Sequence, residues 1–371
     1  MVLIMLASVV VAFKQFDRGA LKQLLNWRYI AFAQFCIFFL INAAVYPVWD
    51  SPRMHYRAIA LESWSVSLLC VGILALWLHI QKASDIKRAL IVWLPIALTL
   101  SFLIATFFYT SGTQGKRISL FTPNPLIPPF WFLVFSVLSF TWLSEMMRWE
   151  RVWRLGLFLM AGLMTVYGGA RLVLLAWFLC GCALTVWLYM QAEKKKRLGL
   201  LLRVGLVFSI CLAGMVLVDF FAGGKMLARM AIFSQVDFTY ESISDKFLRL
   251  RIWTGALSII SENVLLGIGQ VNERFSIQQE MGWDRWLRAH QTYLSYLMAG
   301  GILALISGLL MQSPVLAFVS AAKRPTFFPA FLGLGVIITL NCLTDSIFQS
   351  AVSVQVFMVT TLIVLRASDA D

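Results

Sequence analysis

Residues 172–190 read LVLLAWFLCGCALTVWLYM, a run without a charged residue that is long enough to cross a lipid bilayer as one helix. Similar apolar runs recur along the 371-residue chain, in which 60% of the residues are hydrophobic and 13% are charged. This composition, with a mean hydropathy of +0.81, lies outside the range of soluble domains. The chain is therefore expected to be an integral membrane protein.

The apolar runs predict an all-α, polytopic transmembrane bundle with about eleven spans, or about twelve if the N-terminus is incomplete. The expected spans are 1–13, 29–49, 60–80, 90–110, 130–146, 156–169, 172–190, 205–218, 292–318, 327–343 and 350–365. No stretch remains for a separate soluble domain, so residues 1–371 are expected to form one membrane domain. Its one large loop, partly helical, is expected at 219–290.

The Lys and Arg residues predict the orientation, because positively charged loops are retained in the cytoplasm. One set of loops, together with Arg366, holds 18 of the 31 Lys and Arg residues, while the short loops opposite hold five. The long loop and Arg171 are thereby placed outside, facing the periplasm in a cell with an outer membrane. Topology explains most of the net charge of +13, so we expect no nucleic-acid partner.

The long loop carries eight basic residues that retention in the cytoplasm does not explain, which makes an anionic lipid or a phosphate group the natural partner. Within it, residues 247–262 have the apolar spacing of a helix, with Arg249 and Arg251 near its start. The face at helical spacing comprises Leu250, Trp253, Leu257 and Ile260. Side chains two positions apart on a helix point about 200° apart, so one ligand would meet Arg249 in preference to Arg251. Alternatively, this helix simply lies on the lipid headgroups.

Two further residues stand out by position. Arg171, in Tyr167-Gly-Gly-Ala-Arg171, interrupts a long apolar run and predicts a break between two helices, unless it only snorkels at a helix end. His290 lies where the long loop re-enters the membrane, and imidazole titrates near neutrality, as a general base requires. His55 and His79 have weaker claims. All six cysteines fall in apolar segments, so neither a disulfide nor a metal site is indicated.

The order of these motifs resembles the O-antigen ligase and polymerase superfamily over roughly residues 155–320. The residues that carry the resemblance are Gly168-Gly-Ala-Arg171, Arg249-xxx-Trp253, Glu262-Asn263, Gly267-x-Gly269 and His290-Gln-x-Tyr-Leu, ending near Gly301. Proteins of this family transfer glycan from undecaprenyl pyrophosphate to an acceptor hydroxyl at the periplasmic face of the bacterial inner membrane. The resemblance implies that no cofactor, nucleotide sugar or metal is needed.

By the same resemblance, Arg171, Arg249 and Arg251 would bind the pyrophosphate and His290 would act on the acceptor. Candidate contacts to acceptor or donor are Arg53, Arg288, Gln291 and Tyr293. A ligase that delivers glycan to the lipid A core is slightly favoured over a polymerase that joins lipid-linked repeat units. A transporter or flippase is the alternative from another class, although charged groups at mid-membrane, which transport needs, are scarce here.

Overall fold

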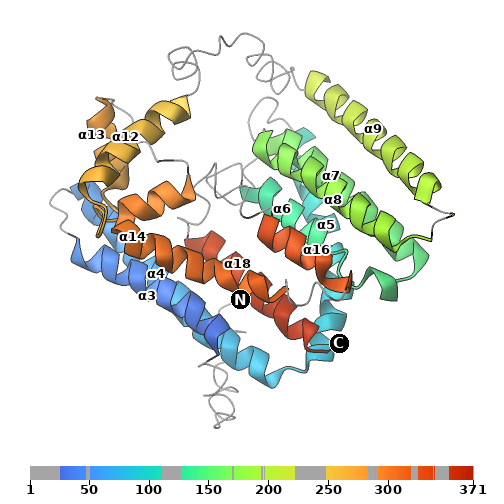
Figure 1. Ribbon diagram of the computed structural model, residues 1–371, viewed down its shortest axis with the longest axis horizontal. Coiled ribbons are helices and arrows are strands. Elements are labelled where there is room, and N and C mark those ends of the chain that lie inside the picture. Colours follow the sequence, from blue (N-terminus) through green and yellow to red (C-terminus); the bar gives the residue numbers. More distant parts are fainter. Residues whose placement is uncertain are drawn as a thin grey trace. The chain divides into compact units, whose positions relative to one another are not determined.

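The structure is a computed structural model, and it describes residues 26–46, 51–110, 127–168, 171–193, 195, 197–221, 248–282, 289, 291–318, 325–336, 338 and 351–370. Within these ranges every regular element is a helix (Figure 1). The chain packs as two compact units. Unit 1 combines Met1–Lys87, Asp237–Ala317 and Asn341–Asp371, and unit 2 combines Arg88–Val236 and Phe318–Leu340.

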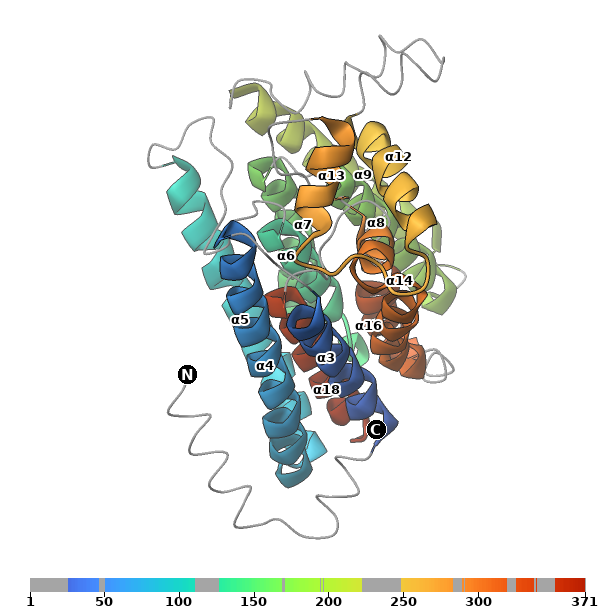
Figure 2. The same ribbon diagram turned by 90° about the vertical axis from the view of Figure 1, so that its left-hand side faces the viewer.

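Unit 1 is built on four helices, α3 (Trp27–Val45), α4 (Ser51–Ile80), α14 (Thr292–Gln312) and α18 (Ala351–Ser368). α14 continues into the 3₁₀ helix η4 (Ser313–Leu316). Two shorter helices, α12 (Leu248–Glu262) and α13 (Glu273–Met281), lie together at one end of this unit (Figure 2). They come from the stretch 219–290, which is partly helical in its described residues.

Polar side chains fix how the apolar helices of unit 1 pair. Gln34 on α3 exchanges two hydrogen bonds with Ser307 on α14, at 2.9 and 2.8 Å. On the other side, Gln355 of α18 donates to the hydroxyl of Ser67 on α4 at 2.9 Å, and Arg366 donates to the carbonyl oxygen of Leu78 at 3.1 Å. Because apolar surfaces alone leave helices free to slide in lipid, these bonds define the register.

Unit 2 contains most of α5 (Ala83–Thr110), together with helices packed around α7 (Arg148–Gly168). Its other elements are α6 (Ile127–Leu138), η1 (Leu143–Glu145), α8 (Arg171–Gln191), α9 (Arg197–Phe221), η5 (Pro325–Phe327), α16 (Phe328–Phe331) and the π-helical turn η6 (Leu332–Val336). The indole of Trp177 on α8 stacks on Phe158 of α7 and donates to its carbonyl oxygen at 2.8 Å. α7 ends at Gly168 and α8 begins at Arg171, which confirms the predicted helix break.

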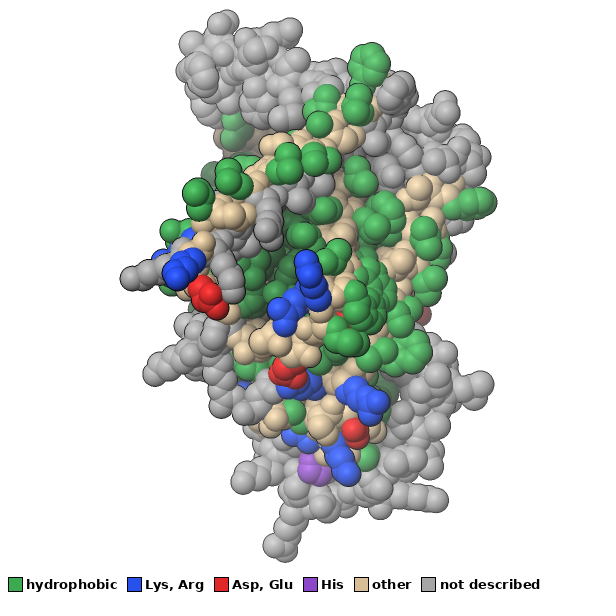
Figure 3. All heavy atoms as spheres, turned by 90° about the vertical axis from the view of Figure 1, so that its right-hand side faces the viewer, with side chains coloured by type: hydrophobic (Ala, Val, Ile, Leu, Met, Phe, Trp, Pro, Cys, Tyr) green, Lys and Arg blue, Asp and Glu red, His purple; other side chains and the backbone are tan. Residues whose placement is uncertain are grey.

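The described helices expose large hydrophobic side chains to an extent that suits lipid rather than water. Examples are Trp93, Phe107, Leu206 and Phe220, each more than 60% exposed. Figure 3 shows hydrophobic side chains over much of one face of the molecule, with Lys and Arg side chains gathered lower on it. This surface agrees with the expectation that the chain is an integral membrane protein.

In the described part of the chain, five helices are long and apolar enough to cross a membrane. They are Trp27–Val45, Arg53–Ile80, Ala83–Phe107, Leu172–Gln191 and Thr292–Leu316. The expected spans 156–169, 205–218 and 350–365 also coincide with helices, namely α7, α9 and α18. The span 1–13 lies outside the described residues, and the number of about eleven spans stays a prediction.

One expected span is wrong as a single helix. In 130–146, α6 ends at Leu138, and Trp142 adopts a left-handed conformation at φ 62°. The Ser136 and Ser139 hydroxyls bond carbonyl oxygens three residues earlier, a local alternative that competes with regular helix. In 327–343, the described residues 327–336 run through η5, α16 and the π-helical η6 without a gap, and the remainder apart from residue 338 lies outside the described residues.

The expected span 292–318 is broken inside α14. Gly300 (φ −149°, ψ 25°) and Gly301 (φ 61°, ψ −150°) are not helical. In a straight helix, residues 296 and 308 would be about 18 Å apart. Here the Tyr296 ring lies directly against Gly308, and the Tyr293 hydroxyl donates to the Gln312 side chain at 3.2 Å. Residues 292–300 therefore fold back on the remainder of α14.

Candidate active site

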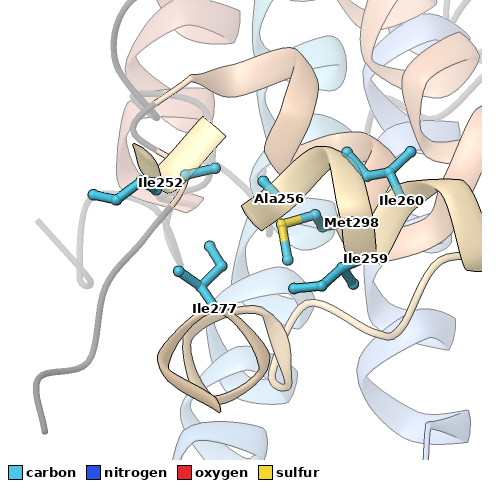
Figure 4. Packing of buried hydrophobic residues seen from close by; sticks show 7 residues of the cluster. Ile252, Ala256, Ile259, Ile260, Ile277 and Met298 are labelled. Carbon is cyan, nitrogen blue, oxygen red and sulfur yellow. The ribbon is translucent and has the colours of Figure 1, made fainter. Parts of the chain in front are cut away.

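Two helices, a loop and the first part of α14 form a cap at one end of unit 1. We define the cap as residues 248–282, Ala289 and 291–300. Its interior is a hydrophobic cluster that draws on α12, α13 and α14, with Ile252, Ala256, Ile259, Ile260, Ile277 and Met298 at its centre (Figure 4). Full burial of such a side chain contributes roughly 1.5–3 kcal/mol, so this cluster accounts for the cohesion of the cap.

The packed face of α12 differs in part from the predicted one. Ile252, Ala256, Ile259 and Ile260 are buried, at the spacing of one helix face. Trp253 and Ile260 pack in the cluster as predicted, whereas Leu257 is 53% exposed. Hydropathy alone ranks Leu257 above Ala256, but Ala256 is the fully buried residue, and beside it a Cβ added at Gly255 would lie 3.2 Å from the sulfur of Met281 on α13.

The loop 263–272 completes the hydrogen bonds that the break in α14 leaves open. The N–H groups of Ile268 and Gly269 donate to the carbonyl oxygens of Met298 and Ala299, at 2.7 and 2.9 Å. The N–H of Ile302 donates to the carbonyl oxygen of Val264 at 2.9 Å. Buried backbone N–H and C=O groups must be hydrogen-bonded. The break in α14 therefore requires the loop 263–272, and the loop requires the break.

Glycine is required on both sides of this contact. Gly267 has φ 66°, and a Cβ there would lie 2.5 Å from the carbonyl oxygen of Met298. At Gly301, also at positive φ, a Cβ would collide with the backbone of Leu265. The motif Gly267-x-Gly269 is therefore the contact surface of the loop with α14, a more specific role than the end of a helix.

Asn42 ties the same loop to the membrane helices. This buried α3 side chain donates to the carbonyl oxygen of Ala299 at 2.8 Å and accepts from the N–H of Gln270 at 2.9 Å. The Gln270 side chain in turn accepts from the indole of Trp64 on α4 at 3.0 Å. One amide side chain thus joins α3, α14 and the loop, which gives the cap a fixed position on unit 1.

Ala289, the residue before His290, is held from two sides. Its carbonyl oxygen accepts from the Trp253 indole at 2.7 Å, and its N–H donates to Oε1 of Glu273 at 3.2 Å. The same carboxylate oxygen accepts from the Ser295 hydroxyl at 2.9 Å. Glu273 is only 2% exposed. The cap therefore fixes the approach to position 290 although His290 itself lies outside the described residues.

Two predicted contact residues have structural partners. Gln291 is the N-cap of α14, where its side-chain oxygen accepts from the N–H of Leu294. Tyr293 donates to Gln312, as described above, and its ring meets that of Tyr296 edge to face. Both residues therefore contribute to the fold-back of α14, and their contact with a substrate stays a prediction.

The predicted pyrophosphate ligands fall in different parts of the chain. Arg249 and Arg251 lie in the first turn of α12 and both are exposed. They stand on either side of Leu250, and because side chains two positions apart on a helix point about 200° apart, we expect them to leave the cap in different directions. Arg171 is the first residue of α8 in unit 2. Arg288 lies outside the described residues, as His290 does.

Arg53 lies beside the cap with an aromatic partner. Its guanidinium carbon is 4.6 Å from the ring centre of Phe275 on α13. In the reverse arrangement, Arg274 of α13 lies 5.3 Å from the ring centre of Tyr56 on α4. Cation–π contacts hold a guanidinium flat against a ring while its edge keeps N–H groups for an anion.

Glu273 and Arg274 are absent from the residues that sequence reasoning selected. The spacing of Glu273, Ile277 and Met281 was an available signal, because residues four apart share one helix face. An acid in line with two apolar residues predicts a carboxylate turned toward the interior. A prediction based only on the basic residues of the loop does not use this acidic signal.

The fold and the site define a helical membrane protein that gathers arginines, a buried carboxylate and the approach to His290 in one cap. Residues 155–308 match the family model described as O-antigen ligase. This match confirms the resemblance to the O-antigen ligase and polymerase superfamily over residues 155–308. The match supports ligase- or polymerase-like processing of glycan by a membrane protein. No match was found among curated proteins.

Proposed function

We propose that the protein is an O-antigen ligase-like glycosyltransferase. It moves a glycan from undecaprenyl pyrophosphate to a hydroxyl group of the lipid A core, at the periplasmic face of the bacterial inner membrane. The observation that carries this proposal is the coincidence of the family match, residues 155–308, with the segment that holds Arg171, Arg249 and the whole cap.

The reaction is a single displacement at the anomeric carbon of the glycan. An acceptor oxygen forms the new bond to this carbon while the bond to the pyrophosphate oxygen breaks, and the pyrophosphate leaves with the electron pair. The acceptor proton passes to His290. Pyrophosphate is a good leaving group, so positioning and charge stabilisation supply most of the rate enhancement.

Arg171, Arg249 and Arg251 have the chemistry that the leaving group needs. A guanidinium stays protonated at physiological pH and binds phosphate oxygens through paired, charge-assisted hydrogen bonds. Arg249 and Arg251 are exposed at the start of α12, so a lipid-borne pyrophosphate can reach them. Because the two diverge, we assign the pyrophosphate to Arg249 before Arg251.

The acceptor is assigned to the side of the cap where Arg53 and Arg274 face aromatic rings. A phosphorylated or acidic sugar would meet the edges of two guanidinium groups there. Arg288, Gln291 and Tyr293 are the further contacts that we propose, since they lie within three residues of His290 in the chain.

A polymerase, which joins lipid-linked repeat units to one another, is the second candidate. It uses the same donor and the same leaving group, so every residue assigned above would keep its role. The one difference is the acceptor, which would be a growing glycan instead of the lipid A core.

The lipid-linked glycan in cells that lack the protein separates these functions. Undecaprenyl pyrophosphate would be extracted and its glycan measured by mass spectrometry. Long polymer on the lipid is the expected result, because chains would be built but not delivered. Single repeats would instead identify a polymerase. If neither species accumulates, the proposal of a glycan transferase is wrong and a transporter takes its place.

The role of His290 has its own test. A His290→Ala strain should accumulate the same lipid-linked glycan as the deletion strain while the protein remains in the membrane at its normal level. His55→Ala provides the matched control, because His55 is also assigned to the outer face but has no proposed role. Normal surface glycan in the His290→Ala strain would remove this histidine from the mechanism.

A further inference from the structure

Two arginines and two aromatic rings form one cluster where the cap meets α4. Arg53 of α4 lies 4.6 Å from the ring centre of Phe275, and Arg274 of α13 lies 5.3 Å from that of Tyr56. The rings of Tyr56 and Phe275 meet edge to face, with 6.4 Å between their centres. All four side chains are half-buried. Each helix thus contributes one cation and one ring, and we call this cluster the clasp.

The clasp brings two like charges to one pair of rings. The two guanidinium groups repel each other, and contact with the ring faces offsets only part of that repulsion. The acid next to Arg274, Glu273, is 2% exposed and accepts hydrogen bonds from the Ala289 N–H and the Ser295 hydroxyl. Its carboxylate is therefore engaged in the cap interior. An anion bound at the clasp would offset the remaining repulsion.

A phosphate monoester suits the clasp better than a carboxylate does. A carboxylate has one charge and two oxygens, which a single guanidinium can bind through two parallel hydrogen bonds. A phosphate monoester has about 1.5 to 2 negative charges at neutral pH and three strong acceptor oxygens, so two guanidinium groups can bind it at once. Arginines from two helices therefore match the phosphate both in charge and in the number of hydrogen bonds.

We infer that the clasp, through Arg53 and Arg274, binds a phosphate monoester carried by the acceptor glycolipid. The inference rests on the proposed function, in which this side of the cap receives the acceptor, and it names the chemical group that is recognised. Because one arginine belongs to α4 and the other to α13, the bound phosphate joins the membrane helices to the cap.

Binding of matched acceptors tests this inference without any transfer reaction. The probe is lipid A core extracted from the deletion strain, used as isolated or after dephosphorylation with cold aqueous hydrofluoric acid. Its Kd would be measured on the full-length protein in a phosphate-free maltoside detergent. We expect the phosphorylated form to bind at least about tenfold more tightly, the effect of one charge-assisted hydrogen bond. Equal Kd values would overturn the inference.

Variants separate recognition of the phosphate from structural support. Arg53→Gln and Arg274→Gln should each weaken binding of the phosphorylated form by about tenfold and leave the other form within about twofold. Arg251→Gln is the matched control, since it also removes one charge from the cap but at the start of α12, and it should keep the preference. Equal weakening of both forms by the clasp variants would show a merely structural role and overturn the inference.

A lysine variant keeps the test decisive if Arg274→Gln fails to accumulate. Arg274→Lys retains the charge but loses the paired hydrogen-bond geometry of a guanidinium. It should therefore lose part of the preference for the phosphorylated form. Equal weakening of both forms would overturn the inference here too.

The donor also carries phosphate, so its binding is measured separately. Undecaprenyl pyrophosphate should bind to Arg274→Gln as tightly as to the unchanged protein. A matched loss of donor and acceptor binding would place the pyrophosphate at the clasp and overturn the inference. The proposed function fails in a different way. Selective binding of the phosphorylated acceptor, without transfer of glycan to either form, would uphold the phosphate site and refute the transferase, whereas transfer to both forms with equal acceptor KM would do the reverse.

Discussion

The indole Nε1 of Trp253 donates a 2.7 Å hydrogen bond to the carbonyl oxygen of Ala289, thirty-six positions later in the chain. The bond spans the interior of the cap, from the second turn of α12 to the residue before His290. Because Arg249 lies one turn earlier on α12, this single contact couples the proposed pyrophosphate ligand to the proposed base.

Trp253→Phe should therefore lower transfer more than it lowers stability. Phenylalanine keeps the ring in the cluster but leaves the Ala289 carbonyl oxygen without its donor, which costs about 1–3 kcal/mol when such a group is buried. Thermal unfolding and transfer rate would be measured on the purified protein. Leu257→Ala, an exposed change on the same helix, should alter neither, and equal effects of the two changes would refute the coupling.

Gly301→Ala should be strongly destabilising. Its backbone angles fall in a region reserved for glycine, which adds about 1–3 kcal/mol of strain for another residue, and its Cβ would collide with Leu265. Gly72→Ala in α4 is the control, since a Cβ there meets nothing within 4 Å. The apparent Tm in detergent should fall for Gly301→Ala and stay or rise for Gly72→Ala. Equal Tm values would show that the break is not obligatory.

Asn42→Leu should release the loop 263–272 from the membrane helices. The change removes the bonds to Ala299 and Gln270, and each lost partner of a buried group costs about 1–3 kcal/mol. Gln34→Leu removes bonds from the same pair of helices, α3 and α14, at a point away from the loop. We expect both variants to lose stability but only Asn42→Leu to lose kcat per folded molecule, and a loss of kcat in both would argue against the specific link.

Arg274→Gln should weaken acceptor binding alone. Loss of one charge-assisted hydrogen bond, worth about 1.5–3 kcal/mol, would raise the acceptor KM by roughly tenfold or more. Donor KM should be unchanged, and Arg53→Gln should behave in the same way. Arg148→Gln, an exposed change in the segment assigned to the cytoplasm, serves as the control. A parallel rise in donor KM would instead assign Arg53 and Arg274 to pyrophosphate binding.

The outward orientation of the cap can be tested by labelling. In a cysteine-free variant, Leu266→Cys should react with a membrane-impermeant maleimide on intact spheroplasts, because residue 266 is 63% exposed on the loop. Lys195→Cys, exposed in the segment assigned to the cytoplasm, should react only after lysis. The opposite pattern would invert the topology derived from Lys and Arg.

Much of the architecture was predictable because a bilayer constrains sequence strongly. Long apolar runs predicted the helices of both units, and the charge at Arg171 predicted the end of α7 and the start of α8. The left-handed Trp142, which ends the helix expected at 130–146, was not predictable, since its conformation depends on packing against Phe327 from a distant part of the chain.

The site was predictable to a lesser degree. Arginines are recognised in a sequence by their charge, so Arg249, Arg251 and Arg53 could be selected. Gly300-Gly301 reads as an ordinary pair of small residues in an apolar run, and only the loop at 263–272 makes it a break. The interior contacts of Glu273 likewise follow from long-range packing, which spacing can suggest but not establish.

The fold-back of α14 also bears on how the protein is made. Residues 292–318 emerge from the ribosome as one apolar stretch that the insertion machinery could accept as a single helix. In the finished protein the nine residues before Gly301 fold back on the part after it, so they cannot remain in line with it as one straight helix. That arrangement depends on Asn42, synthesised long before, and on the loop 263–272. Formation of the cap therefore comes late in membrane insertion, after α3 is in place.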